Sequence, residues 1–267
     1  MAGILAWPRN VAGFIGYHRH IIWALLMREI STRYGRDNIG YVWLIAEPML
    51  FGTGVALLYS YIRSPFENGI PIVAFTLTGY MPMILFRQGV NYTMKSTAIN
   101  NGLLYHRNIT PLHLFISRFF TEFCGVSLAY MVEIFFANFL GLMPLPKDML
   151  LLVAGWLLLT LQACGVAMIM NAMSEMFDVV ERFIPLLTYL FIPISGFMYM
   201  IAVLPPRLQK KAIYIPFVHC FELMRSGYFG EFLTVVYNIP YALAWGVGFL
   251  LLGLLLQQFV RPRVEVL

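Results

Sequence analysis

The sequence predicts an all-α membrane protein that crosses the bilayer several times. Of its 267 residues, 60% are hydrophobic and only 12% are charged, and its mean hydropathy is +0.75. Soluble domains carry about 25% charged residues, so this chain has too little charge to solvate the surface of a soluble enzyme. Six apolar stretches are long enough to form helices of about 20 residues, the length that spans a bilayer. The predicted fold is one domain over residues 1–267, with an interfacial amphipathic helix in 1–37 and a six-span bundle in 38–267.

The predicted spans cover residues 39–62, 70–94, 119–143, 149–173, 183–204 and 239–260. The second is the least ideal, because it contains two prolines and Arg87. The fifth is interrupted by Pro185, Pro193 and Gly196. An even number of spans places both termini on the same side of the membrane.

The basic residues indicate which side that is. One set of predicted loops holds 11 lysines and arginines: Arg9, Arg19, Arg28, Arg33, Arg36, Lys95, Arg107, Arg118, Arg182, Arg261 and Arg263. The other set holds 6: Arg63, Lys147, Arg207, Lys210, Lys211 and Arg225. Cytoplasmic loops carry the excess of basic residues, so both termini are predicted to be cytoplasmic. These loops and anionic lipid headgroups account for the net charge of +5 without a nucleic-acid partner.

Residues 17–36 form a basic, moderately amphipathic segment before the first span. Trp23, Leu26, Ile30 and Tyr34 recur at helical spacing, and Arg28 falls on the opposite side. Such a helix lies flat in the membrane interface. It either anchors the first span or borders a lateral entrance for an anionic lipid-linked substrate.

Several charged residues lie in or beside the spans, where ionisable groups normally face protein or water. Arg87 either reaches toward the interface, pairs with Glu47, or lines a polar path for an anionic substrate. Arg118 and Glu122 are spaced i, i+4 and are expected to pair. Glu133 lies deeper, and the sequence indicates no partner for it.

Residues 205–237 are too polar to span a membrane and too apolar for an ordinary exposed loop. Pro216 divides them into two short apolar-periodic pieces, which predicts short or re-entrant helices on the outer side, between spans five and six. Such a segment is either a structural lid or an outer gate. The candidates for a gate are His219, Glu222 and Arg225, and the last two are spaced to form a locking ion pair.

The loop between spans two and three contains a small apolar group within polar surroundings. We expect a short helix that ends before Thr110 and Pro111. Its apolar residues either lie back on the bilayer or form a compact docking surface. The candidate docking residues are Asn101, Leu103, Leu104, Tyr105 and Arg107.

The motifs of common enzyme sites are missing from the sequence. It contains no GxxxxGK[ST] phosphate-binding loop, no HExxH motif and no nucleophile elbow. The five histidines form no cluster with acidic residues, and the three cysteines show no CxxC spacing. We therefore expect a non-catalytic chain without a metal site. A polytopic enzyme of glycan assembly and a secondary transporter remain as alternatives.

Two stretches resemble the permeases of type-two ABC exporters. The first is REISTRYGRDNIGYVWLIAEP, with Arg28, Arg33, Tyr34, Gly40, Trp43 and Pro48. The second is IPFVHCFELMRSGYFG, with Pro216, His219, Glu222 and Arg225. Together with the length and the six spans, the resemblance covers nearly the whole chain. Within that family it looks most similar to permeases of bacterial capsular-polysaccharide exporters.

The resemblance implies a homodimer in the bacterial inner membrane that docks two separate ATPase subunits through the loop between spans two and three. ATP and Mg would bind to those subunits, and this chain would hold no cofactor. The cargo would be a lipid-linked polysaccharide, with O-antigen or teichoic acid as alternatives, and envelope-spanning export proteins would be further partners. Candidate path residues are Arg33, Arg36, Glu47 and Arg87, with Tyr41, Tyr80, Phe86 and Tyr92 to stack on sugars.

Overall fold

The computed structural model describes residues 11–34, 39–62, 66–67, 70–105, 109–230 and 236–260. In order, its elements are α1 (Val11–Tyr34), α2 (Ile39–Ile62), β1 (Phe66–Glu67), β2 (Ile70–Pro71), α3 (Ile72–Thr93), α4 (Ser96–Ile99), the 3-10 helix η1 (Asn101–Tyr105), α5 (Pro111–Phe139), α6 (Met149–Met176), α7 (Asp178–Leu190), the 3-10 helix η2 (Ile201–Val203), α8 (Pro206–Ala212), α9 (Pro216–Phe229) and α10 (Ile239–Gln257). The two strands pair antiparallel. The described part is mostly helical, which confirms the all-α fold class.

Within the part of the chain that the structure describes, four helices are long and apolar enough to cross a membrane: Val42–Ile62 in α2, then α5, α6 and α10. The two remaining predicted spans take a different form. Helix α3 has 22 residues but is less apolar, and α7 ends at Leu190 after 13 residues. The interruption predicted in the fifth span is present, and whether residues 183–204 cross the membrane stays a prediction. Turns follow Leu190, and Gly196 adopts φ +94°, a backbone conformation outside any helix.

The start of α5 also differs from the prediction. We expected Pro111 to close a short helix, with the third span beginning near residue 119. Instead Thr110 is the N-cap, its hydroxyl accepting a hydrogen bond from the N–H of His113, and Pro111 is the first helical residue. Proline is favoured at this position because its missing N–H would have no helical partner anyway. Arg118 consequently lies inside a helix.

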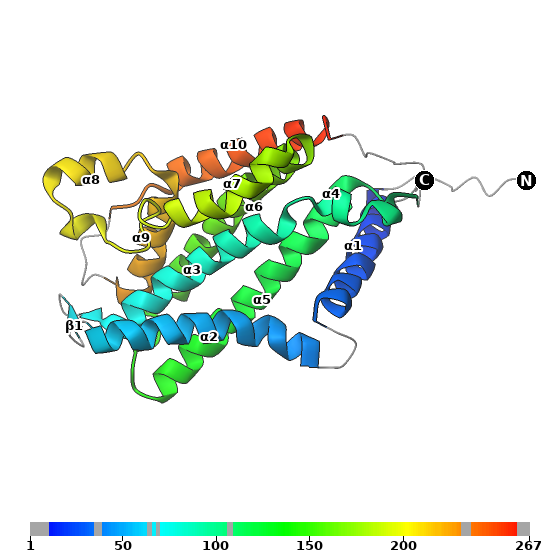
Figure 1. Cartoon of the computed structure of the whole chain (residues 1–267). Helices are drawn as coiled ribbons and strands as arrows, with labels where there is room; N and C mark the ends of the chain where they lie inside the picture. The colour runs from blue at the N-terminus through cyan, green and yellow to red at the C-terminus, as the bar shows by residue number, and fades with distance from the viewer. Residues whose placement is uncertain are drawn as a thin grey trace, which may run out of the picture.

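Helix α6 is the centre of the packing. It contacts α10, α9 and α3, while α3 contacts α2, α5 and α7 (Figure 1). Two glycines of α6 allow close approaches of its neighbours. A Cβ on Gly165 would lie 2.6 Å from the backbone nitrogen of Leu250 in α10, and one on Gly155 would lie 2.5 Å from Cγ of Met224 in α9. Small residues at such crossings let membrane helices pack closely.

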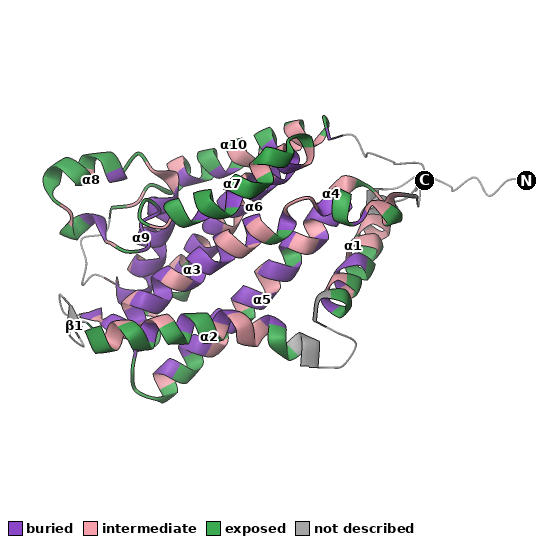
Figure 2. Ribbon diagram, in the orientation of Figure 1, coloured by how far each residue is buried: buried purple, intermediate pink, exposed green. Residues whose placement is uncertain are grey.

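Helix α9 lies within this packing, and α8 does not. Figure 2 shows α9 almost entirely buried, whereas α8 and the outer face of α2 are exposed. The predicted break at Pro216 is present, because α9 begins there. Apolar residues of α9 belong to the main core, and the two alternatives, a structural lid and an outer gate, stay predictions.

Helix α1 packs on α5 and α2 at one end of the molecule (Figure 1). It begins at Val11, earlier than predicted. Leu26 and Ile30 form a small buried cluster with Leu44 of α2, while Trp23 is exposed. Its buried side therefore faces protein, and its place in the membrane interface stays a prediction.

Candidate functional site

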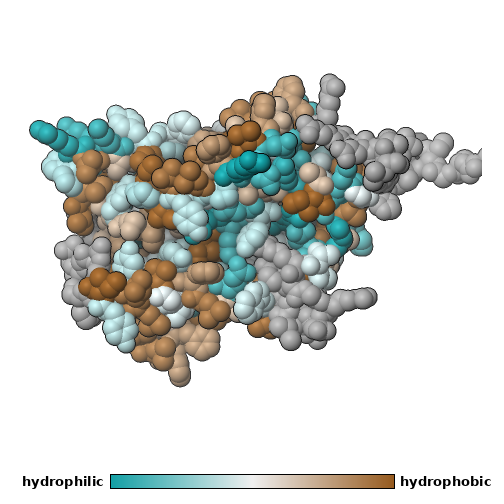
Figure 3. Space-filling model, in the orientation of Figure 1, coloured by the Kyte–Doolittle hydropathy of each residue, from teal (hydrophilic) through white to brown (hydrophobic). Residues whose placement is uncertain are grey.

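A polar-lined cavity of about 440 Å³ lies between α2, α3 and α7. Its lining residues are Glu47, Phe51, Tyr80, Ile84, Arg87, Gln88, Asn91, Tyr92 and Tyr189. Figure 3 shows hydrophilic side chains across the middle of the same face, between two largely hydrophobic areas. A second cavity, of about 420 Å³ between α3, α6, α7, α9 and α10, has an apolar lining. The first cavity is the better candidate for a polar cargo.

Glu47 and Arg87 both line the polar cavity, but they do not form the ion pair that was one expectation. Glu47 Oε1 accepts a hydrogen bond from the Tyr92 hydroxyl at 3.2 Å. The Arg87 guanidinium lies over the Tyr189 ring, with its central carbon 4.0 Å from the ring centre. Arg87 Nε has no hydrogen-bond partner. A cation held mainly by a ring keeps donors available for an anionic ligand.

The other predicted path residues divide into three groups. Arg36 and the side chain of Arg33 lie outside the described residues, as does the side chain of Tyr41. Tyr80 and Tyr92 line the polar cavity. Phe86 was a wrong prediction, because it packs against Phe191 and Phe217 in the apolar core.

On the end of the bundle predicted to face the cytoplasm, the short helix α4 is joined firmly to the end of α6. Glu175 Oε1 accepts hydrogen bonds from the backbone N–H groups of Thr97 (2.6 Å) and Ala98 (3.3 Å). Asn171 Oδ1 accepts another from the N–H of Ser96 at 3.2 Å. Side chains of α6 thus satisfy the donors at the start of α4, which its own short turn leaves unpaired. The sequence analysis missed this role of Asn171 and Glu175; the one signal was their position at the polar end of an apolar helix.

Lys95 connects the start of α4 to α7 as well. We call this group of contacts between α4, the end of α6 and the start of α7 the junction. Its ammonium lies 2.7 Å from Glu181 Oε2 and 2.9 Å from Asp178 Oδ1. The hydrogen bonds that its ammonium donates to Glu181 and Asp178 raise the pKa of Lys95 above its usual value. Lys95 also has φ 47°, a left-handed conformation that turns the chain sharply from α3 into α4. The segment after α3 is therefore tied to both α6 and α7.

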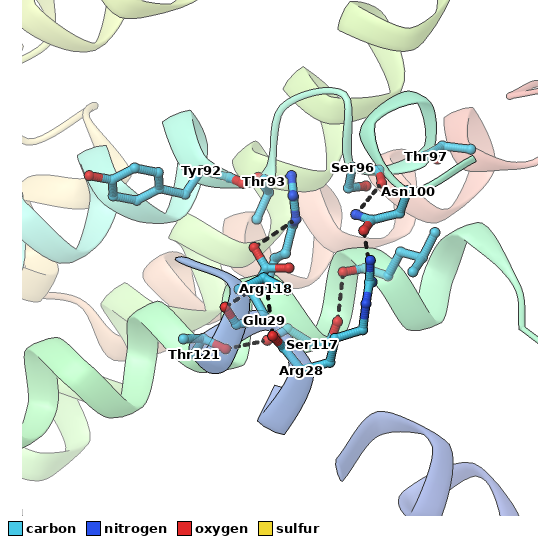
Figure 4. A network of polar contacts seen from close by, with 12 residues as sticks. Arg28, Glu29, Tyr92, Thr93, Ser96, Thr97, Asn100, Ser117, Arg118 and Thr121 are labelled. Atoms are coloured by element: carbon cyan, nitrogen blue, oxygen red, sulfur yellow. Dashed lines mark hydrogen bonds and ion pairs between the residues drawn. The ribbon is translucent and has the colours of Figure 1, made fainter. Parts of the chain in front are cut away.

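Helix α1 reaches this junction through two polar contacts (Figure 4). Arg28 donates to Asn100 Oδ1 at 3.0 Å, and Arg118 of α5 lies 3.1 Å from Glu29 Oε1. The expected pairing of Arg118 with Glu122 is thus replaced by an ion pair between helices. The junction connects α1, α4, α5, α6 and α7.

Four of the five predicted docking residues, all but Arg107, lie on η1, directly after α4. Asn101, Leu103 and Leu104 are half-buried. The side chain of Tyr105 and all of Arg107 lie outside the described residues. Short helical pieces before Thr110 match the expected conformation, and the docking role stays a prediction.

The three candidate gate residues are all buried, and each binds backbone. Arg225 donates to the carbonyls of Gly196 (2.9 Å), Phe197 (2.5 Å) and Tyr199 (2.5 Å). Glu222 Oε1 accepts from the N–H of Ile201 at 3.1 Å. Since no ion pair joins Glu222 to Arg225, the predicted locking pair is wrong.

His219 is similarly occupied. Its Nδ1 accepts from the N–H of Asn238 at 3.2 Å, and its Nε2 lies 2.8 Å from the carbonyl of Ile213. With Nδ1 accepting, Nε2 is the donor. Glu222 and Arg225 hold the segment after α7 against α9, and His219 binds the chain before and after α9. Within the described part of the chain, no group of three or more His, Cys, Asp and Glu side chains could hold a metal ion.

Comparison with known proteins identifies the class to which this chain belongs. Residues 20–229 match the ABC-2 type transporter family, and the chain is a member of that family. It is therefore a component of a membrane transporter.

Particular relatives cover nearly the full chain. The capsule polysaccharide export inner-membrane protein CtrC of Neisseria meningitidis serogroup A is 36% identical over 247 residues, which are 92% of this chain and 93% of CtrC. The capsule polysaccharide export inner-membrane protein BexB of Haemophilus influenzae is 33% identical over 245 residues, 92% of each chain. The polysialic acid transport protein KpsM of Escherichia coli is 26% identical over 244 residues, 91% of this chain and 93% of KpsM.

Proposed function

We propose that this chain is the permease subunit of an ATP-driven exporter that moves lipid-linked capsular polysaccharide across the bacterial inner membrane. The observation that carries the proposal is the 36% identity to a capsule polysaccharide export protein over 92% of the chain. The polar cavity with Glu47 and Arg87 supports it, since an anionic glycan needs a polar route through the bundle. The chain itself is non-catalytic, and ATP with Mg binds to a separate subunit.

The proposed topology has six crossings and cytoplasmic termini. Helix α3 and the segment formed by α7 with residues 191–200 add two crossings to the four long apolar helices. The excess of basic residues in one set of loops, 11 against 6, supports the orientation. It places α4, η1 and the junction around Glu175 in the cytoplasm. A cysteine label at residue 267 that reacts only from outside would contradict this topology.

The proposed assembly contains two copies of this chain and two ATP-binding subunits, with envelope-spanning export proteins as further partners. The polar cavity opens on the face where α2 and α7 expose apolar side chains, including Phe51 and Leu187. A second copy packed on that face would enclose the path between two cavities. The ATP-binding subunits dock at η1, from which the junction carries motion to α6 and α7.

Deleting the gene and restoring it tests the function. Deletion should leave the polysaccharide inside the cell, and the wild-type gene should restore it to the surface. Surface polysaccharide that is unchanged after deletion would contradict the proposal. The same cells should yield this chain co-purified with a subunit that carries a GxxxxGK[ST] motif.

The docking surface has its own test. Replacing Tyr105 and Arg107 together with alanine should release the ATP-binding subunit in a detergent pull-down, while the chain still inserts. Replacing exposed Ile99 of α4 with alanine is the matched control and should leave binding unchanged. Retention of the subunit by the double variant would move the docking site to residues 175–182 or to α1.

A further inference from the structure

Glu133 is a buried carboxyl group that the proposed transport path does not use. It lies on α5 and is 3% exposed. Its Oε1 accepts a hydrogen bond from the hydroxyl of Thr53 on α2 at 3.2 Å, and its Oε2 has no hydrogen-bond partner. No ion pair with a basic side chain is formed by Glu133 within the described residues.

The carboxyl group is enclosed between two helices. It borders a cavity of about 100 Å³ whose lining is almost entirely apolar. Besides Glu133 and Thr53, that lining comprises Met49, Ala56, Leu57, Val73, Leu77, Phe136, Ala137, Leu140 and Leu142. Helix α2 lies directly on the carboxyl: a Cβ added to Gly52 would be 2.5 Å from Oε1 and 2.8 Å from Oε2. Gly52 therefore permits this close contact, and a larger residue would require the Glu133 side chain to shift.

An ionised carboxylate is costly in such surroundings. Without water or a cation, a buried carboxyl group takes up a proton instead of keeping its charge. Among the described residues, the titratable groups that interact electrostatically with Glu133 are the phenols of Tyr80 on α3 and Tyr130 on α5. Neither can supply a positive charge. Helix α2 supplies only the hydroxyl of Thr53 at this point.

We propose that Glu133 and Thr53 form a proton-binding site in the membrane between α2 and α5. While α2 covers the carboxyl, Glu133 is held as a neutral acid. When α2 moves away, water reaches the group and the proton leaves. The closed contact between α2 and α5 is then favoured at low pH, because a state that binds a proton is stabilised by protons. This property does not depend on the cargo or on the ATP-binding subunit.

A hydrophobic carbodiimide is a direct probe, because it reacts with protonated carboxyl groups inside membranes. The acid gives its proton to one nitrogen of the reagent, and its oxygen adds to the central carbon. Membranes holding the full complex are treated with N,N′-dicyclohexylcarbodiimide at neutral pH, and modified residues are located by mass spectrometry. We expect modification of Glu133 at a level at least about tenfold above Glu181, which is exposed and paired with Lys95. Modification of Glu133 no greater than that of Glu181 would overturn the proposal.

The dependence on pH is tested with Glu133→Gln, which keeps the shape of the neutral acid but cannot ionise. Thermal unfolding of the purified chain is followed between about pH 6 and pH 9, a range that brackets neutral pH on both sides. The wild type should lose stability relative to Glu133→Gln as the pH rises, because every other group is the same in both chains. Parallel profiles would contradict the proposal. Should the variant fail to insert, the labelling of the wild type still decides.

Discussion

Two arginines on neighbouring helices have opposite surroundings. Arg225 on α9 is fully buried, donates to three carbonyls and lies 4.5 Å from the centre of the Phe75 ring. Arg87 on α3 is half-buried, borders a cavity of about 440 Å³ and lies over Tyr189. Both terminal nitrogens of Arg225 donate to backbone carbonyls, whereas Arg87 lies over a ring beside the cavity and keeps capacity for a ligand.

This difference in surroundings indicates two different roles: Arg225 stabilises the fold, and Arg87 serves transport. Burying a guanidinium is costly unless its donors find acceptors, and the carbonyls after α7 accept from both terminal nitrogens of Arg225, although its Nε has no hydrogen-bond partner. In return, Arg225 fixes a segment that has no helix of its own. Arg87 instead faces a space large enough for part of a ligand. The predictions below test this division, in order of decreasing effect on stability.

Arg225→Met should have the largest effect. It leaves three buried carbonyls without their donor, and the loss should be at least about 3 kcal/mol. Thermal unfolding in detergent measures the loss. Exchanging Glu222 and Arg225 should fail equally, because the two do not form an ion pair. Recovery of stability by that exchange would contradict the geometry.

Gly79→Ala should have the next largest effect on stability. The added Cβ would lie 2.7 Å from Cδ2 and 2.8 Å from the carbonyl oxygen of Phe197, within the segment that Arg225 holds. Overpacking of this kind costs about 1–3 kcal/mol. Gly54→Ala on α2 is the matched control, because nothing lies within 4 Å of its Cβ position. Equal stability of the two variants would show that the segment is not closely packed.

Arg87→Ala should cost only about 0.5–1 kcal/mol, the value of its contact with Tyr189, and yet reduce export strongly. The measurement combines thermal unfolding with quantification of surface polysaccharide. Arg87→Lys keeps the charge and should retain part of the export activity. Normal export by Arg87→Ala would remove Arg87 from the path.

Lys95→Met should have the smallest effect on stability, because the carboxylates of both its ion pairs are exposed to solvent. Glu181 and Asp178 raise the pKa of Lys95, so the ammonium stays charged at neutral pH and its contribution is lost only under strongly alkaline conditions. Unfolding curves of wild type and variant should therefore differ by a constant amount between about pH 6 and pH 9. A difference that changes across that range would point to another titrating group.

The sequence predicted the helical elements well where the signal was local. Hydropathy predicted the N-terminal ends of α2 and α6 closely, and Pro216 marked the start of α9. Prediction failed where a proline has two readings. A proline can either end a helix that precedes it or occupy the first turn of a helix that follows it. We expected the first at Pro111, and the structure shows the second, because Pro111 is the first residue of α5.

For the candidate site, the sequence pointed to Glu47 and Arg87, and the structure places both at one cavity. It could not give their partners. The i, i+3 and i, i+4 spacings of Glu222 with Arg225 and of Arg118 with Glu122 suggested pairs within one helix. Each arginine instead binds a different segment, because tertiary packing offered acceptors that sequence spacing does not show.

By itself, the sequence determined that this protein is an apolar helical bundle with basic residues concentrated in one set of loops, since composition and hydropathy act over each segment separately. It also determined family membership, through motifs spread along the chain. Only the tertiary structure decided which charged residues bind other parts of the protein and which remain able to bind a ligand. That outcome depends on the carbonyls, rings and cavities that other helices bring to each side chain, as Arg225 and Glu133 show.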